Sequence, residues 1–278
     1  MWKLALESMA NDIDTFGPTS FQDYLKIQGL KQPNTAALIS IDSYEKLPTV
    51  LKQNDTMVLR LGSSPSGTGT QFFLVKVKDR LKDFFLFDDE VFTDPKGEYF
   101  NPTVSEAHLI GFRALPVPSE TSLVNLALST GLISMALGLD NQVIPSAPAT
   151  GRSSFTFNVK PHTAIGEVFE HNHGQVEIDA LFVAKRDGRD ILFIIEAKCV
   201  DTHKSLAKHK LVYPVLAVAG NVPNYIPIVP VYMKVQRRAE ELHYHIVECE
   251  YSDLRENIRS IDELTFKKHS HYILKLGE

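Results

Sequence analysis

The feature that most restricts the fold is a pair of apolar segments joined by a short polar turn. Residues 175–184 and 190–199 are rich in Val, Ile, Leu and Phe, and Lys185-Arg-Asp-Gly-Arg189 connects them. Asp-Gly is a preferred central pair for a type I′ turn, so we predict two antiparallel strands that turn at Asp187 and Gly188. Runs as apolar as these are typical of interior strands that are covered on both faces.

A two-residue turn at these positions fixes which residues face each other. Counting back from the turn, Asp179 faces Glu196 and Glu177 faces Lys198. Side chains alternate between the two faces of a strand, so all four side chains share one face. Facing Cβ atoms in such a pair lie roughly 4.5–5.5 Å apart. The hairpin therefore predicts a compact patch of three carboxylates and one lysine.

Carboxylates that face each other inside an apolar sheet require either a raised pKa or a cation. Mg²⁺ binds one or two carboxylates together with phosphate oxygens and water, and Mn²⁺ can substitute for it. We predict Asp179, Glu196 and Glu177 as metal ligands. Lys198 would orient or help to deprotonate a metal-bound water and stabilise charge on a phosphate. The alternative is a salt-bridged patch at a solvent-exposed end of the hairpin, which the apolar strands on both sides disfavour.

The segments around the hairpin predict an α/β fold, a mixed β-sheet flanked by helices. Residues 121–139 contain no Lys, Arg, Asp or Glu, which indicates a helix buried on most of its surface. A second helix is expected over 202–219, kinked or shortened at Pro214. With a strand at 154–159, the two hairpin strands, and strands at 228–235 and 241–251, the order from residue 121 is α-β-β-β-α-β and one further strand.

A proline-punctuated stretch near residue 116 predicts a boundary between residues 1–115 and 116–278. The first part is expected to be a smaller α+β region that contributes target recognition or dimer contacts. Its predicted elements are a helix at 21–28 and strands at 56–61, 71–78 and 83–87. The Gly/Ser-rich loop 62–70 lacks the Gly-Lys-Ser/Thr ending of a P-loop, so we expect it to be a plain hairpin connection.

The hairpin resembles the catalytic core of the PD-(D/E)XK nuclease superfamily, which has the restriction-endonuclease-like fold. The resemblance is carried by Val176-Glu-Ile-Asp-Ala-Leu-Phe182 and by Ile191-Leu-Phe-Ile-Ile-Glu-Ala-Lys198, with Ile178 in the place of the motif's proline. It implies that Asp179, Glu196 and Lys198 bind metal and activate water. The element order over 121–235 is similar as well, so the resemblance covers less than half of the chain.

Many members of that superfamily add a glutamate from the first core helix. Here only Glu120 lies at that helix, at its start, and Glu177, Glu167 and Glu170 are alternatives, with Glu177 the best placed by the pairing. Members also carry a Gln or Lys on the helix that follows the lysine strand. The corresponding candidates for a DNA phosphate contact, with solvated lysines as the alternative, are Lys204, Lys208 and Lys210.

The charge distribution permits a nucleic-acid enzyme without requiring one. The net charge is −5, yet residues 198–210 hold four lysines and one acidic residue, and such a local cluster can attract phosphate. Two cysteines cannot form a disulfide framework, which favours a reduced, cytoplasmic setting. No apolar run approaches the roughly 20 residues that span a bilayer, so no membrane association is expected.

Histidines alternate near the C-terminus, at 243/245 and at 269/271. A zinc site there would need further ligands that the sequence does not supply, so we expect exposed histidines on strands. Cys199, directly after Lys198, is expected to be a packed thiol on the opposite, apolar face.

The combined prediction is a Mg²⁺-dependent DNA endonuclease of restriction or defence type. The alternatives are a structure-specific resolvase or repair nuclease, and a non-catalytic DNA-binding or assembly module on the same fold. One catalytic patch cuts one strand, so a homodimer is expected for double-strand cleavage. Candidate dimer contacts are the N-terminal region and the C-terminal strand at 272–274, which would leave an edge free to pair.

Overall fold

The computed structural model describes residues 1–9, 14–31, 35–65, 67, 69–114, 118–140, 147–199, 201–252 and 258–275. Its strands are β1 (Thr15–Ser20), β2 (Thr56–Ser63), β3 (Thr70–Lys76), β4 (Phe85–Phe87), β5 (Glu98–Tyr99), β6 (Ala149–Val159), β7 (Phe169–Arg186), β8 (Arg189–Lys198), β9 (Ser205–Ala207), β10 (Ile228–Arg238), β11 (Glu241–Glu250) and β12 (Thr265–Lys275). Its helices are α1 (Lys3–Ser8), α2 (Phe21–Ile27), α3 (Thr35–Ile39), α4 (Thr49–Lys52), α5 (Asp88–Val91), α6 (Glu106–Arg113), α7 (Glu120–Ser129), α8 (Leu132–Leu137) and α9 (His209–Ala219), with 3₁₀ turns η1 (Leu81–Phe84) and η2 (Ile261–Glu263).

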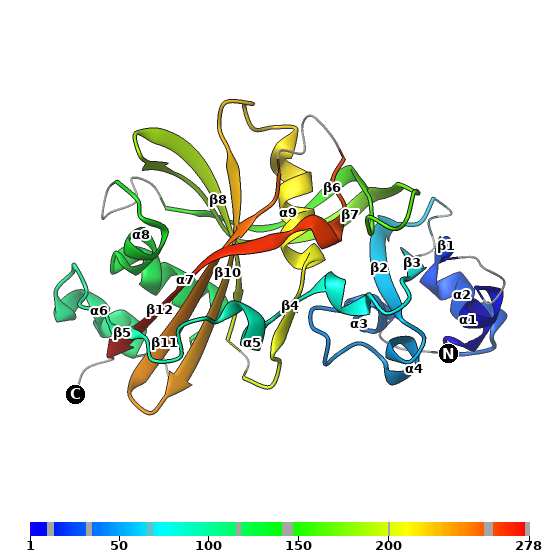
Figure 1. The fold of residues 1–278 in the computed structure, drawn as a ribbon, viewed down its shortest axis with the longest axis horizontal. Coiled ribbons are helices and arrows are strands. Elements are labelled where there is room, and N and C mark those ends of the chain that lie inside the picture. Colours follow the sequence, from blue (N-terminus) through cyan, green and yellow to red (C-terminus); the bar gives the residue numbers. More distant parts are fainter. Residues whose placement is uncertain are drawn as a thin grey trace.

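A large mixed sheet flanked by helices forms the body of the molecule, as the sequence predicts. Ten strands join in the order β1-β3-β2-β7-β8-β10-β11-β12-β5, and β6 also pairs with β7. The body is elongated: α1, α2 and β1 lie at one end, α6 and α8 at the other, and α9 crosses the middle (Figure 1). None of the helices described is long and apolar enough to cross a bilayer.

The central hairpin has the predicted register. β7 and β8 pair from Arg186↔Arg189 to Ala180↔Ile195. Asp187 and Gly188 have φ values of 53° and 74°, the positive angles that a type I′ turn requires. Asp140 fixes the turn by accepting hydrogen bonds from both of these backbone N–H groups, at 2.8 and 2.9 Å.

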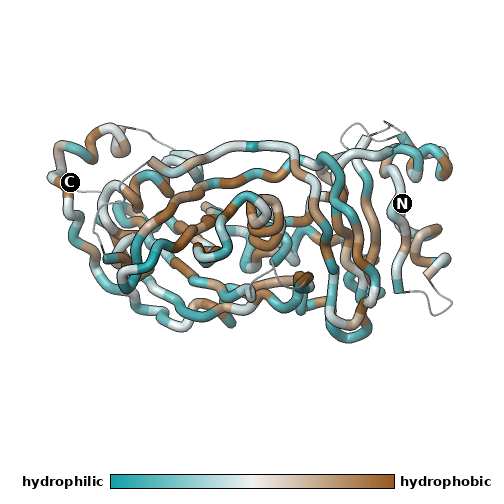
Figure 2. The backbone as a smooth tube through the Cα atoms, turned by 90° about the horizontal axis from the view of Figure 1, so that it is seen from above, coloured by the Kyte–Doolittle hydropathy of each residue, from teal (hydrophilic) through white to brown (hydrophobic). Residues whose placement is uncertain are grey.

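The two faces of the hairpin pack against different helices. Leu192 and Ile194 belong to the core that includes α9, and Phe193 and Ile195 belong to the core that includes α7 and α8. β10 runs parallel to β8, so α9 crosses over the sheet between these two strands. Figure 2 shows the hydrophobic stretches gathered inside the body, with hydrophilic turns around them. The face that carries Glu196 is therefore the face that α9 covers.

Two predicted helices differ from the observed ones. The helix expected over 121–139 is broken into α7 and α8, because Gly131 adopts a left-handed φ of 84° that ends one helix and starts the next. The helix expected over 202–219 begins only at His209, since β9 pairs with β4 just before it. Pro214 lies inside α9 without ending it, in a helix whose residues are nearly all buried.

The N-terminal strands extend the same sheet. β2 and β3 form the predicted hairpin, and Gly62 pairs with Asn172 so that β2 runs parallel to β7. Gly62 has a φ of +89°, and a Cβ atom built there would lie 2.5 Å from the Asn172 carbonyl oxygen, so only glycine permits this approach. The domain boundary predicted near 116 falls among residues 115–117, outside the described residues, and stays a prediction.

At the other end of the sheet, the strand expected to leave a free edge is already paired. β12 pairs with β11 on one side, and Tyr272 and Ile273 pair with β5 on the other. The prediction that 272–274 offers an open edge is therefore wrong. β1 was not predicted because its Gly17-Pro18 pair is typical of a turn, and β5 was not predicted because two residues show no periodicity.

Candidate active site

The predicted polar patch lies at the end of the central hairpin, where the paired ladder stops. Asp179 and Glu196 are the next residues beyond the Ala180↔Ile195 pair. The Oδ2 atom of Asp179 accepts a hydrogen bond from the backbone N–H of Ala197, at 2.8 Å. The side chain of Asp179 thus reaches across to β8 and accepts the hydrogen bond that the N–H of Ala197 would donate to the β7 backbone in a longer ladder.

Glu196 is held between two lysines. Its side chain is 3% exposed, and its Oε1 atom lies 2.8 Å from Lys198 Nζ and 3.3 Å from Lys210 Nζ. Lys198 also donates to the carbonyl oxygen of Ala197, at 2.8 Å. Because α9 packs on this face of the sheet, its first turn delivers Lys210 to the carboxylate. The buried charge of Glu196 is therefore compensated from two directions.

Glu120, the first residue of α7, joins the same group. Its Oε2 atom lies 3.7 Å from Lys198 Nζ, and its Oε1 atom accepts a hydrogen bond from the backbone N–H of Cys199, at 3.3 Å. The sequence offered Glu120 as one of several candidates, and the structure brings it to Lys198. Cys199 is exposed, so its prediction as a packed thiol is wrong; β8 ends at Lys198, and strand alternation stops there.

Glu177 lies at the rim of the group. It is exposed, pairs with Arg152 across the β6–β7 ladder, and accepts a hydrogen bond from the Arg152 guanidinium at 2.9 Å. That bond lowers the pKa of Glu177, with smaller contributions from the charges of Lys210 and Lys198. To bind a metal, Glu177 would have to give up Arg152, just as Glu196 would have to give up a contact with Lys198 or Lys210. Glu177 as a ligand stays a prediction.

The charges of the cluster are unevenly balanced. Burial, followed by repulsion from Glu196, raises the pKa of Asp179 to about 6. Burial alone would lower the pKa of Lys198, but the charges of Glu196, Glu120 and Asp179 outweigh it and raise that pKa well above its ordinary value. Lys198 therefore stays protonated at neutral pH and acts as a cation. The surroundings of Asp179 therefore disfavour its charged form.

Of the three lysines predicted to contact phosphate, the structure brings Lys210 to the carboxylates. Lys208 is 8% exposed and donates to the carbonyl oxygen of Asp262 at 2.9 Å, while burial lowers its pKa. Lys204 is exposed, but its carbonyl oxygen accepts from Asp88 where β9 pairs with β4. Because β9 pairs with β4, Lys204 and Lys208 do not lie on a helix, and their side chains do not point where a helix starting at residue 202 would have placed them.

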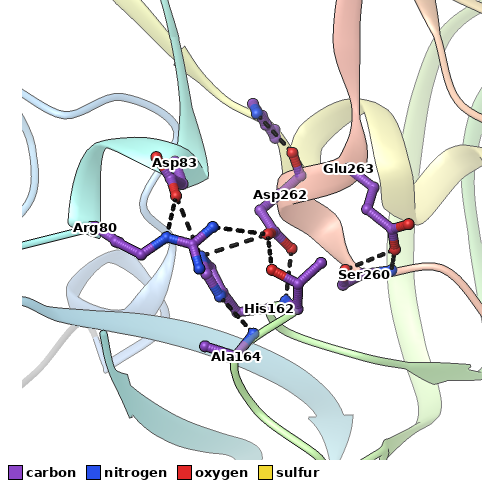
Figure 3. A network of polar contacts seen from close by, with 9 residues as sticks. Arg80, Asp83, His162, Ala164, Ser260, Asp262 and Glu263 are labelled. Carbon is purple, nitrogen blue, oxygen red and sulfur yellow. Dashed lines mark hydrogen bonds and ion pairs between the residues drawn. The ribbon is translucent and has the colours of Figure 1, made fainter. Parts of the chain in front are cut away.

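A second group of possible metal ligands lies elsewhere, between η1 and η2 (Figure 3). Asp83, His162 and Asp262 converge there, with His162 Nε2 lying 3.4 Å from Asp83 and 3.5 Å from Asp262. His162 Nδ1 accepts the N–H of Ala164, so the ring hydrogen lies on Nε2. Arg80 also contacts both carboxylates, at 2.8 and 3.8 Å.

This arrangement does not fit a metal. A histidine that binds metal through Nε2 donates a hydrogen bond from its other ring nitrogen, whereas Nδ1 of His162 is an acceptor. The guanidinium of Arg80 already neutralises part of the carboxylate charge. We conclude that these side chains form a structural network of polar contacts, which links three segments: η1, the residues after β6, and η2.

The C-terminal histidines are packed together, which contradicts their prediction as exposed side chains. His243, His245 and His271 are 7%, 5% and 3% exposed. His243 Nδ1 lies 3.1 Å from His271 Nε2, and His245 Nδ1 lies 3.1 Å from His269 Nε2. The ring of Phe92 stacks on His245 with centroids 4.2 Å apart. The segment that connects α5 to β5 covers these rings, and strand alternation alone cannot reveal such a cover.

These observations define a mixed α/β protein with a buried cluster of carboxylates and lysines at the end of its central hairpin. The chain belongs to the family described as Domain of unknown function (DUF6997), whose model matches residues 96–273. That range includes every member of the cluster, from Glu120 to Lys210. Searches among characterised proteins and among solved structures returned no match.

Proposed function

We propose that this protein is a metal-dependent nuclease that hydrolyses phosphodiester bonds in DNA, as an endonuclease of restriction or defence type. The observation that carries the proposal is the cluster around Lys198, in which Glu196 and Glu120 both contact the lysine and Asp179 is hydrogen-bonded to the neighbouring Ala197. The order α7–α8, β6, β7, β8, α9, β10, with β10 parallel to β8, also supports the resemblance to the restriction-endonuclease-like core. The short β9 is an addition to that order.

The ligand chemistry of the cluster suits a hard divalent cation. Among the described residues, however, its three carboxylates do not bring their oxygen atoms within 4.8 Å of one another, so they would have to move together to bind one. All the candidate ligand atoms are oxygens, from three carboxylates and from the carbonyl group of Ala197, and oxygen ligands are those that Mg²⁺ prefers. Three carboxylates against Lys198 and Lys210 leave the group with a formal charge of −1, which a divalent ion would relieve. A cation would stabilise the charge of Asp179, because burial and Glu196 raise the pKa of this carboxyl group. When bound, Mg²⁺ would supply an activated water and stabilise charge on the phosphate.

Each residue of the cluster has its own role in this proposal. Asp179 and Glu196 would hold the cation, and Glu120 would add a third carboxylate from α7. Lys198 stays protonated, so it orients the attacking water and stabilises negative charge on the phosphate rather than accepting a proton. Lys210, held 3.3 Å from Glu196, is placed to meet a phosphate oxygen when that carboxylate engages the cation.

The test is cleavage of supercoiled plasmid DNA with Mg²⁺ or Mn²⁺ by the full chain and by two matched variants. Glu196→Gln removes a ligand without changing side-chain volume and is expected to abolish cleavage. Glu250→Gln makes the same change at an exposed position of β11, outside the candidate site, and is expected to leave cleavage unchanged. Cleavage by Glu196→Gln at the wild-type rate would remove the proposed site. Heat on addition of Mg²⁺ with no cleavage of any DNA would instead support a non-catalytic binding module.

A further inference from the structure

A pocket adjoins the candidate active site, and the nuclease chemistry does not use it. Its volume is about 250 Å³. It lies where residues 39–42 and β2 of the N-terminal region meet β6, β7 and α9. Glu177 and Lys210 belong both to its lining and to the surroundings of the carboxylate cluster. An occupant of the pocket would therefore lie next to a phosphate held at the cluster.

The pocket contains an arginine that has no ion-pair partner among the described residues. Arg60, on β2, is half-buried, and no carboxylate ion pair to it occurs among the residues that the structure describes. Its Nε atom is buried with no hydrogen-bond partner. The nearby Arg152 carries the same charge and is itself paired with Glu177. An unpaired guanidinium is costly to bury, so its presence points to a ligand that supplies acceptors.

The rest of the lining is not that of a simple anion site. Ile39, Ile41, Val176 and Pro214 provide apolar surface, and the rings of His171 and Tyr213 provide aromatic surface. Asp42 adds an acceptor: its Oδ2 atom is paired with Lys46 at 2.7 Å, and its Oδ1 atom has no hydrogen-bond partner. A carboxylate would repel a phosphate. Apolar walls, an arginine donor and a carboxylate acceptor together match a planar heterocycle that presents both acceptors and donors.

We propose that this pocket binds one unstacked nucleobase of the DNA strand held at the carboxylate cluster, with guanine preferred. The proposal rests on the proposed nuclease function, which places a strand beside the pocket. Guanine presents two adjacent acceptors, O6 and N7, that a single arginine can contact at once, and Arg60 is the donor for this edge. The N–H groups of guanine match the carboxylate of Asp42. An extruded base gains the apolar contacts that it loses on leaving the stack.

The test measures binding of mononucleotides to the full chain by calorimetry, without metal and without cleavage. The probes are dGMP, dAMP, dCMP, dTMP and 2-deoxyribose 5-phosphate, which has the sugar and phosphate but no base. We expect dGMP to bind at least ten-fold more tightly than 2-deoxyribose 5-phosphate. Equal binding of the two would make this a phosphate site and overturn the proposal, as would the absence of dGMP binding at millimolar concentration.

Variants assign the binding to the pocket. Arg60→Gln is expected to weaken dGMP binding about ten-fold, the usual discrimination of a bidentate arginine contact. Arg189→Gln, at the exposed hairpin turn, removes the same charge elsewhere and is expected to have no effect. Ser40→Trp, at the exposed rim, is expected to block the pocket even if Arg60→Gln folds poorly. Unchanged dGMP affinity in both pocket variants would overturn the proposal.

The two proposals fail in different ways. If plasmid is cleaved and no nucleotide binds, the pocket proposal falls and the nuclease stands. If dGMP binds through Arg60 but no DNA is cleaved with any metal, the nuclease proposal falls and the base-binding pocket stands. Calorimetry without metal distinguishes these results, because nucleotide binding in the pocket does not require metal ligation by Asp179 or Glu196.

Discussion

Replacing Asp179 with asparagine should stabilise the metal-free protein, although it should abolish cleavage. The pKa of Asp179 is raised from 3.8 to about 6 by burial and by Glu196. A folded-state pKa that is raised means that the folded protein binds the proton more tightly. The associated stability is therefore present below pH 3.8 and is lost as the pH rises through 6. Asparagine removes the charge, and its amide oxygen can still accept the hydrogen bond from Ala197.

The magnitude follows from the size of the shift. About two pKa units correspond to about 3 kcal/mol at pH 7.5, and the difference shrinks to about 1 kcal/mol at pH 4.5. The assay is urea unfolding of both proteins in EDTA at the two pH values. Asp190→Asn, on the same hairpin, removes an exposed carboxylate paired with Lys185 and should change stability by less than about 1 kcal/mol. The reasoning would be refuted if Asp179→Asn did not raise the free energy of unfolding at pH 7.5, or if it raised it equally at both pH values.

Three further predictions follow from the structure. Lys198→Ala should still bind metal but should cleave DNA about a hundred-fold more slowly or worse, as measured in single-turnover reactions. A loss of metal affinity as severe as that of Glu196→Gln would contradict the role of Lys198 as a cation. The buried histidines of β11 and β12 should make the protein acid-sensitive, because burial lowers the pKa of His245 to about 2 and that of His269 to about 4. The stability that is present above pH 6.5 should therefore fall steadily towards pH 4. A urea midpoint that stays constant over that pH range would contradict this prediction. Double-strand cleavage should require a homodimer, so light scattering should detect a dimer at least on a DNA duplex, and a monomer that makes both breaks in one encounter would disprove this.

The hairpin register could be predicted because local chemistry determines it. Asp187-Gly188 specifies the turn, and strand alternation then places Asp179, Glu196 and Lys198 on one face. The end of the ladder at Ala180 could not be predicted, because it depends on the side chain of Asp179 taking the N–H of Ala197. Turn propensity and periodicity contain no information about that exchange.

The remaining differences arise from contacts between segments far apart in the sequence. Glu120 reaches Lys198 because α7 packs under the hairpin, and a position at the start of a helix does not reveal this direction. Lys208 is buried because β9 pairs with β4, a strand some 120 residues earlier in the chain. The C-terminal histidines are covered by the segment around Phe92. Each of these features depends on tertiary packing that overrides local pattern.

The close approach of Gly62 to Asn172 has a consequence for engineering. The N-terminal strand β2 joins the central sheet backbone to backbone at Gly62 and Asn172, with no room there for a side chain on residue 62. A truncated protein beginning after residue 116 would expose the edge of β7 at Asn172, and such an edge invites aggregation with other chains. Exchange of N-terminal regions between homologous proteins would therefore succeed only if β2 and its glycine were transferred intact.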